Sequence, residues 1–155
     1  MDIRSAALSY LEHRMRTAKE MERRLKEKGF EEGEIAETME WLKESRYIDD
    51  VAYGTEYLRY AFGKSRGINR AKIEMSERGI SPGDIEKAIF AYEDENDVDI
   101  MEEEERRAMA EGENMVHRNG RDEKAMAKLG RRLNSLGYST GLIYKVINRY
   151  RNPDS

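Results

Sequence analysis

The sequence predicts an all-α protein of three tandem three-helix repeats that form an elongated, curved helical array. Residues that favour helices dominate the 155-residue chain, which has only 2 prolines. Apolar residues recur at helical spacing, and the same apolar pattern occurs three times. Because 39% of the residues are charged and the mean hydropathy is −0.93, we expect a thin core shared among small units.

The repeated pattern surrounds three pairs of glycine and an apolar residue, Gly29-Phe30, Gly79-Ile80 and Gly137-Tyr138. Equivalent apolar positions precede and follow each pair: Met21, Leu25, Ile35, Met39 and Leu42; Ala71, Met75, Ile85, Ile89 and Tyr92; Leu129, Leu133, Ile143, Ile147 and Tyr150. This spacing places one apolar stripe on each of two helices. The glycine suits the left-handed position that ends a helix, where a side chain would clash.

Capping residues predict where the helices begin. Thr17 with Glu20 forms a capping box, Ser81-Pro82 is an N-cap followed by proline, and three further caps are expected at Asn69, Asp122 and Ser139. A further helix precedes each pair, with apolar positions at Leu8, Leu11 and Met15; at Tyr53, Tyr57 and Ala61; and, within 98–118, at Met101, Ala108 and Met115. The predicted repeats are residues 1–48, 49–95 and 96–155.

Charge alternates along the chain, with net values of +3 for residues 1–30, −6 for 31–50, +3 for 51–79, −10 for 80–115 and +6 for 116–155. The helix before each glycine is the basic one. The candidate binding residues are Arg23, Arg24, Lys26, Lys28, Lys64, Arg66, Arg70, Lys72, Arg121, Lys124, Lys128, Arg131 and Arg132. Repeated cationic patches suit a polyanion such as nucleic acid, although cations near a helix C-terminus also favour the helix dipole. The acidic blocks suggest a second, protein-facing surface.

The sequence lacks the motifs of the common catalytic and cofactor sites. It has no cysteine, P-loop, GxGxxG or GxSxG motif, and His13 and His117 stand alone. The acidic run from Tyr92 lacks the ligand pattern of an EF-hand and is expected to be a linker and a solvated helix start. We therefore expect a non-enzymatic protein without cofactor, metal or membrane segment, cytoplasmic and monomeric.

Three segments carry a resemblance to a known family. The stretch "YLEHRMRTAKEMERRLKEKGFEEGEIAETMEWLKESRYIDDVAYGTEYLRY" resembles the first half of RecX proteins. "GKSRGINRAKIEMSERGI" is similar to the second unit of that family, but Ile68 stands where the family usually has proline, which predicts a looser turn after Gly67. "KAMAKLGRRLNSLGYSTGLIYKVI" resembles the C-terminal unit. The resemblance covers about residues 7–150.

The resemblance implies three tandem three-helix units and a regulator of the RecA recombinase. It implies binding to the filament of RecA on single-stranded DNA, with inhibition of filament growth, ATP hydrolysis, strand exchange and co-protease activity. The expected partners are the RecA nucleoprotein filament and, weakly through its phosphates, single-stranded DNA.

Two other functions remain open from the residues alone. One is a helix-turn-helix protein that reads duplex DNA, which needs a basic last helix in each unit. The helix after the glycine is acidic in the first repeat and basic only in the third, which disfavours this function. The other is a helical adaptor that binds only protein.

Overall fold

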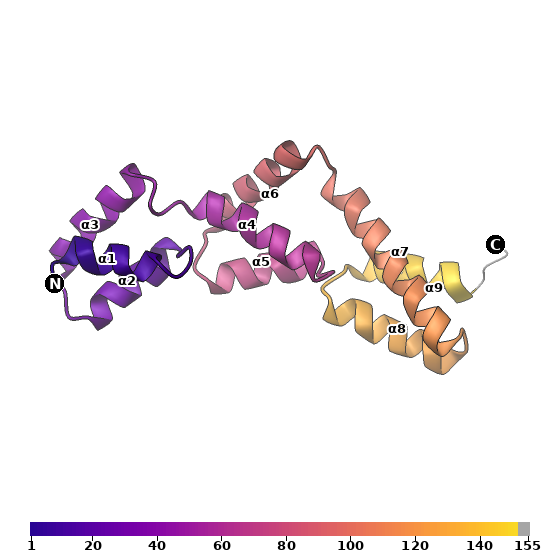
Figure 1. The fold of residues 1–155 in the computed structure, drawn as a ribbon. Helices are drawn as coiled ribbons and strands as arrows, with labels where there is room; N and C mark the ends of the chain where they lie inside the picture. Colours follow the sequence, from indigo (N-terminus) through magenta and orange to yellow (C-terminus); the bar gives the residue numbers. More distant parts are fainter. Residues whose placement is uncertain (152–155) are drawn as a thin grey trace. The chain divides into compact units, whose positions relative to one another are not determined.

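The computed structural model describes residues 1–151, and this part of the chain consists of helices joined by short turns (Figure 1). The helices within it are α1 (Ile3–Leu11), α2 (Ala18–Glu27), α3 (Glu32–Glu44), α4 (Asp50–Gly63), α5 (Ile68–Glu77), α6 (Pro82–Asn96), α7 (Ile100–Asn119), α8 (Glu123–Ser135) and α9 (Thr140–Arg151). The predicted all-α class is confirmed.

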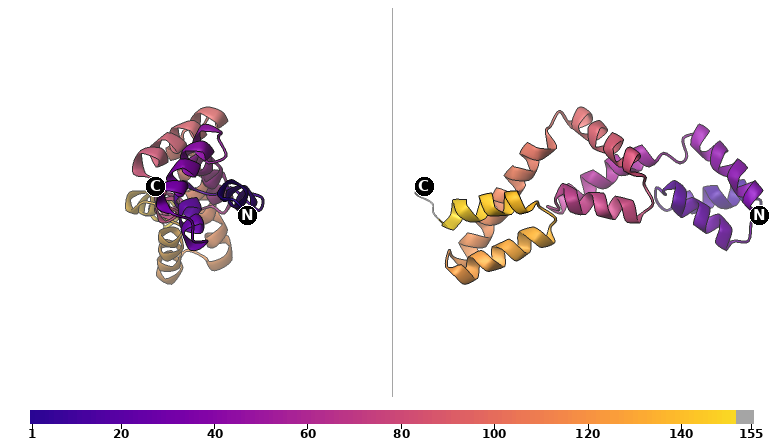
Figure 2. Two further views of the ribbon diagram at one scale, coloured as in Figure 1. Left: turned by 90° about the vertical axis from the view of Figure 1, so that its left-hand side faces the viewer. Right: turned by 180° about the vertical axis from the view of Figure 1, so that it is seen from behind.

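Internal contacts divide the chain into two compact units. The first joins Met1–Tyr57 with Glu74–Ala91, and the second joins Leu58–Ile73 with the chain from Tyr92 on. In the first unit, α1, α2 and α3 pack around a core that contains Met21, Leu25 and Leu42. In the second, α8 and α9 both pack against α7 (Figure 2). The borders predicted between the three repeats stay a prediction.

The three glycine turns have the predicted geometry. Gly29, Gly79 and Gly137 have φ values of 89°, 92° and 89°. In each turn the glycine N–H donates to a carbonyl three residues back, and the next N–H donates to one five residues back; for Gly29 and Phe30 the acceptors are Lys26 at 3.0 Å and Leu25 at 3.2 Å. This pair of bonds is the Schellman motif, which satisfies carbonyls that the end of a helix leaves without partners.

Most of the predicted apolar positions are buried. The buried ones are Met21, Leu25, Ile35, Met39, Leu42, Tyr53, Tyr57, Ala61, Ala71, Met75, Ile85, Ala108, Met115, Leu129 and Leu133. The later positions of α6 and α9 are half-buried, and the helices bury Ala88 and Val146 completely instead. His13 and His117 are exposed.

The predicted capping residues lie where expected, with one exception. The Thr17–Glu20 capping box is complete. The side chains of Ser81, Asp122 and Ser139 each accept a backbone N–H of the first helical turn that follows, at 3.2, 2.8 and 3.2 Å.

The cap predicted at Asn69 is wrong, because Asn69 already lies inside α5, which begins at Ile68. The carbonyl of Gly67 accepts the first helical bond, from Ala71 at 3.1 Å. Gly67 therefore holds the cap position. Gly67 has no side chain that could accept an N–H of the first turn. The carboxylate of Glu104, from α7, accepts the N–H of Ile68 instead.

The prediction that Met15 lies on the apolar stripe of the first helix is wrong. Helix α1 ends at Leu11, and Met15 is 46% exposed. The Nε of Arg16 donates to the carbonyl of Tyr10 at 3.1 Å, in place of a helical N–H. The capping box that follows also requires Thr17 to be extended, with ψ of 162°.

Met101, predicted on the buried stripe of α7, is 80% exposed. The buried stripe starts one residue earlier and consists of Ile100, Glu104, Ala108, Gly112 and Met115. Because one residue turns a helix by about 100°, Met101 faces away from this stripe.

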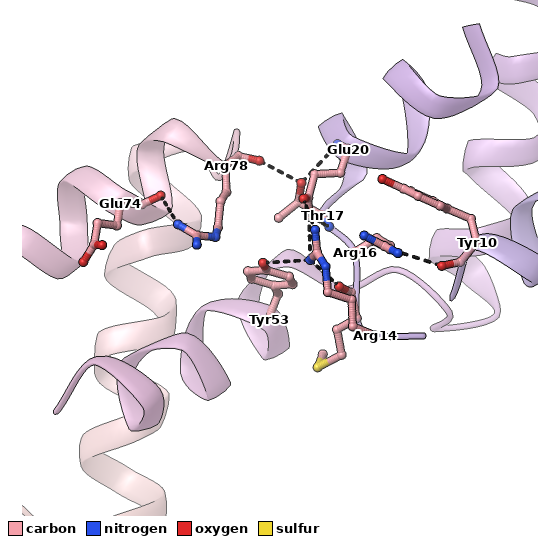
Figure 3. Close-up of polar contacts among 9 residues, drawn as sticks. Tyr10, Arg14, Arg16, Thr17, Glu20, Tyr53, Glu74 and Arg78 are labelled. Atoms are coloured by element: carbon pink, nitrogen blue, oxygen red, sulfur yellow. Dashed lines mark hydrogen bonds and ion pairs between the residues drawn. The ribbon is translucent and has the colours of Figure 1, made fainter. Parts of the chain in front are cut away.

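Within the first unit, the N-terminus of α2 docks on the Gly79 turn (Figure 3). The hydroxyl of Thr17, fully buried, donates to the carbonyl of Arg78 at 2.7 Å. The carboxylate of Asp50, from α4, accepts the N–H of Ala18 at 2.9 Å. A methyl group on Gly79 would lie 2.5 Å from Cβ of Lys19, so the turn admits α2 only because it lacks a side chain.

The second unit repeats this arrangement at the N-terminus of α5. The N–H of Gly67 donates to the carbonyl of Leu136 at 2.6 Å, and the carboxylate of Glu104, from α7, accepts the N–H of Ile68. The turn expected to be loose is therefore held by hydrogen bonds from two other segments. A proline at position 68 would have no N–H for Glu104.

The two carboxylates share an electrostatic property. Burial raises the pKa of both Asp50 and Glu104, while the N–H that each accepts lowers it. We call each of these two contacts, at α2 and at α5, a helix-start junction.

We predict that Gly79→Ala destabilises the protein more than Gly29→Ala. Both glycines have positive φ, which costs a residue with a Cβ about 1–2 kcal/mol. Only at Gly79 would the methyl overlap a neighbour, since nothing lies within 4 Å of a Cβ at Gly29, and such overpacking adds about 1–3 kcal/mol. Urea denaturation of the two variants measures the difference. Equal losses would show that Lys19 yields without cost.

We predict that Glu104→Gln reduces the pH dependence of stability, whereas Glu104→Ala lowers stability at all pH values. Because the folded protein raises this pKa above 4.5, it binds the proton more tightly than the unfolded chain. The contribution of Glu104 to stability therefore decreases as pH rises from about 4.5 through the folded pKa. Glutamine keeps an acceptor for Ile68 and removes the charge, while alanine leaves that N–H unpaired, at a cost of about 1–3 kcal/mol.

Denaturant titrations at pH 4 and pH 7 test both substitutions. A wild-type and a Glu104→Gln protein with the same change in stability between these pH values would contradict the prediction.

Candidate functional site

The cations of the first basic helix lie on different faces of α2. Arg23 and Lys26 line a groove between α2 and α3 whose floor includes Ile35 and Met39. Lys26 lies 3.9 Å from the carboxylate of Glu32, and both side chains are well exposed. Such a pair contributes little to stability and leaves the ammonium accessible.

The two remaining cations of this helix differ in burial. Lys28 is exposed at the end of the helix. Arg24 is half-buried, with its guanidinium carbon 5.3 Å from the ring centre of Tyr10. The predicted residues of this repeat are therefore not one continuous surface.

The cations of the second repeat lie close to the helix-start junction at α5. The Nη1 of Arg70 donates to the carbonyl of Ser135 at 3.0 Å. The positive charge of Lys72 lowers the pKa of Glu104, against the larger effect of burial. The guanidinium of Arg66 lies 5.3 Å from the ring centre of Tyr60, and Lys64 is exposed. Arg70 and Lys72 therefore contribute to the packing of the second unit.

The third repeat gathers its cations in a groove between α7 and α8, within the second unit. Its lining consists of Met115, Arg118 and Asn119 from α7, and Lys128, Arg131, Arg132 and Ser135 from α8. We call this the α7–α8 groove. Arg132 lies 3.3 Å from the carboxylate of Glu111, which is outside the lining. The lining thus contains four cationic residues and no acidic one, and Glu111 beside it partly neutralises Arg132.

Two predicted residues of the third repeat lie outside this groove. Lys124 is exposed one turn before Lys128 on α8. The Nη1 of Arg121 donates to the carbonyl of Tyr150 at 2.8 Å, near the end of α9. Arg121 therefore links the start of α8 to α9.

The α7–α8 groove has the chemistry of an anion site. Guanidinium groups donate paired N–H bonds to phosphate oxygens, and lysine adds a mobile charge. Four cations from the two walls of the groove, one of them paired with Glu111, attract a polyanion through neutralisation of its phosphates, which requires no reading of bases.

The described residues have no arrangement typical of a metal site or a membrane segment. Across residues 1–151, histidine and carboxylate side chains nowhere gather in groups of three or more that could bind a metal ion. In the same range, no helix combines the length and apolar character that crossing a bilayer requires.

Sequence reasoning missed four residues that the fold brings beside the predicted cations. Arg118 and Asn119 belong to the α7–α8 groove, and the ring of Tyr10, against which Arg16 also lies, is beside Arg24. The position of Arg118 three residues after the buried Met115 is a helical spacing that could have revealed it. No local signal in the sequence indicates that Arg16 and Arg24 share one tyrosine ring.

Comparison with known proteins gives consistent matches. Residues 4–42 match the model of the RecX family described as its first three-helix domain. Regulatory protein RecX of Clostridium perfringens is 30% identical over 152 residues, which are 96% of this chain and 68% of that protein. Regulatory protein RecX of Clostridium botulinum strain Eklund 17B is 28% identical with the same coverage of both chains.

A solved structure resembles the fold as well. The crystal structure of RecX from Lactobacillus salivarius superposes with a TM-score of 0.81 at 25% sequence identity, and the match covers 96% of this chain and 94% of that one.

Proposed function

Since this chain belongs to the RecX family, whose members include regulatory proteins, we propose that it regulates the RecA recombinase. It binds the filament of RecA on single-stranded DNA and inhibits recombination, ATP hydrolysis and co-protease activity, without catalysis of its own. RecA filaments form on chromosomal DNA, so the proposal places the protein in the cytoplasm. Family membership is the observation that carries this proposal.

The α7–α8 groove supports a contact with the phosphates of the filament DNA. Its four cations are Arg118, Lys128, Arg131 and Arg132. A groove of this kind binds single strands weakly and with a strong salt dependence. The contact positions the protein on the filament and reads no sequence.

A second groove, between α7 and α9, supports a contact with protein. Its lining consists of Glu102, Glu105, Arg106, Met109, Ala110 and Glu113 from α7 and Tyr150 from α9. The ammonium of Lys145 lies 2.7 Å from the carboxylate of Glu105, so carboxylates outnumber cations here by a small margin. Carboxylates repel phosphates, so this side of the second unit suits a partner surface with positive charge. A regulator that contacts both RecA and DNA requires two such surfaces.

The direct test measures DNA-stimulated ATP hydrolysis by RecA from the same organism. This protein is added at concentrations below that of RecA, with the DNA saturated by RecA. A fall in the hydrolysis rate is the expected result. An unchanged rate, with the protein shown to be folded by circular dichroism, would refute the proposed inhibition.

We predict that Lys128→Gln/Arg131→Gln weakens inhibition of RecA. Both side chains line the α7–α8 groove and are exposed, so their loss removes phosphate contacts with little effect on folding. The concentration for half-maximal inhibition is expected to rise about tenfold at low salt, where each phosphate contact counts most. Titrations of RecA ATPase at two salt concentrations measure the effect.

The matched control is Lys43→Gln/Lys87→Gln, which removes the same charge at exposed sites outside the predicted set. If the control weakens inhibition as much as the groove variant, net charge and not the groove is responsible.

A further inference from the structure

Arg4, Trp41 and Tyr47 form a small cluster on the surface of the first unit. Trp41 is in the last turn of α3, Tyr47 follows that helix, and Arg4 is in the first turn of α1. The ring centres of Trp41 and Tyr47 are 5.6 Å apart. The guanidinium carbon of Arg4 lies 4.3 Å from the centre of the Trp41 ring. We call these three residues the Trp41 cluster.

The chain after α3 holds the two rings of the cluster in place. The N–H groups of Tyr47 and Ile48 both donate to the carbonyl of Leu42, at 2.9 and 3.2 Å, and Ile48 is buried. Trp41 is half-buried and packs against the core of the first unit. The fold therefore positions the rings before any partner binds, which lowers the entropy lost on binding.

The outer side of the cluster remains accessible. Tyr47 is 52% exposed, and its hydroxyl has no hydrogen bond within residues 1–151. Arg4 is exposed, and in the same part of the chain no carboxylate lies within ion-pair distance of it. Tryptophan, tyrosine and arginine are the residue types that most often dominate the binding energy of a protein interface.

Carboxylates of α3 lie beside the Trp41 cluster. Glu37 precedes Trp41 by four residues and Glu44 follows it by three, and such positions are neighbours on one face of a helix. Glu34 is one turn before Glu37 on the same face. All three are exposed, and none has an ion pair within residues 1–151. Lys43 lies on the opposite side of α3, because two positions turn a helix by about 200°. We call Glu34, Glu37 and Glu44 the acidic rim.

The charge of this surface determines which ligand suits it. The acidic rim has three carboxylates and the Trp41 cluster has one guanidinium, so the surface is negative. It repels the phosphates of nucleic acid and attracts ammonium and guanidinium groups. The exposed ring of Tyr47 also favours a cation over its face. Lysine and arginine side chains provide these charges on long apolar stems that can cover aromatic rings.

We propose that the Trp41 cluster and the acidic rim bind a basic segment of a protein partner. Lysine or arginine side chains of that segment pair with the rim, and their stems cover the rings of Trp41 and Tyr47. The identification of this partner as RecA rests on the proposed function. The surface belongs to the first unit, whereas the groove between α7 and α9 belongs to the second, so this contact is an additional one.

The test measures binding kinetics on RecA filaments by biolayer interferometry. The filaments are assembled on biotinylated oligothymidylate with a slowly hydrolysed ATP analogue, and a second sensor carries the oligothymidylate alone. The ring variant is Tyr47→Ala, and the rim variant is Glu37→Gln/Glu44→Gln. The matched control is Glu12→Gln/Glu27→Gln, which removes the same charge at exposed sites outside α3.

The two variants should differ in which rate they change. Loss of a central aromatic contact mainly speeds dissociation, so the ring variant should leave the filament about tenfold faster. Loss of rim charges mainly slows association, so the rim variant should associate about threefold more slowly at low salt and with a weaker salt dependence. Both variants should bind oligothymidylate alone as the wild type does, and the control should match the wild type on both sensors. Thermal unfolding by circular dichroism verifies each fold.

A second measurement examines the site without RecA. Trp41 is the only tryptophan in the sequence, so tryptophan fluorescence reports on the Trp41 cluster alone. Decalysine, which has no aromatic group, serves as the basic ligand. We expect decalysine to change the emission of Trp41 in a salt-dependent way and to bind the rim variant about threefold more weakly.

Two outcomes would overturn the proposal. In the first, both variants bind the filament like the wild type and decalysine leaves the emission of Trp41 unchanged, while the wild type still inhibits RecA; the proposed function then stands without this surface. In the second, the variants lose affinity for oligothymidylate alone to the same extent as for the filament, which assigns the surface to nucleic acid.

A third outcome separates this surface from the proposed function. If the wild type does not bind the filament, but decalysine changes its Trp41 emission and binds the rim variant more weakly, the docking surface is supported and RecA is not its partner.

Discussion

Each compact unit depends on one contact, in which the N-terminus of a helix docks on a glycine turn that lies farther along the chain. The helix is α2 at the Gly79 turn and α5 at the Gly137 turn. The first N–H groups of a helix have no acceptor within that helix, so their burial requires acceptors from other parts of the chain. Asp50 supplies the acceptor at α2 and Glu104 supplies it at α5. In return, Thr17 and Gly67 donate to the carbonyls that precede the two glycines. Each junction therefore satisfies donors and acceptors on both sides at once, and a change on either side leaves a buried group unpaired.

The helix-start junctions distinguish two kinds of cationic side chain: those that contribute to packing and those that face solvent and can bind a partner. Arg70 donates to a carbonyl of the segment that α5 contacts, and Lys72 lies near the buried Glu104. The cations of the α7–α8 groove, such as Lys128 and Arg131, face solvent and take no part in a helix-start junction. Substitutions at Arg70 would change packing and binding together, so the groove residues give a cleaner measure of phosphate contacts.

The helices and their ends could be predicted because local chemistry determines them. The left-handed glycine at position 29, 79 or 137 follows from the backbone alone, and the Thr17–Glu20 box lies within one turn. The cap of α5 could not be found locally, because Glu104 lies 36 residues away in the chain. The basic helices could likewise be recognised from the sequence. Which of their cations pack against the protein could not, because the contacting residues, such as Ser135 beside Arg70, are distant in the chain. The apolar spacing also predicted wrongly that Met15 lies on the buried stripe of the first helix. The helix ends before it, and the side chain of Arg16 donates to the carbonyl of Tyr10 in place of a helical N–H.

Helix α7 separates charges of opposite sign across its own width. Met109 lies in the acidic groove shared with α9, and Arg118 lies in the basic groove shared with α8. Nine positions along a helix make about two and a half turns, so these residues face opposite sides. Along the axis, nine residues also span about 13.5 Å at the helical rise of about 1.5 Å per residue. The two linings are therefore offset along α7 as well as across it. Under the proposed function, one helix would thus carry the phosphate contact on one face and a protein contact on the other.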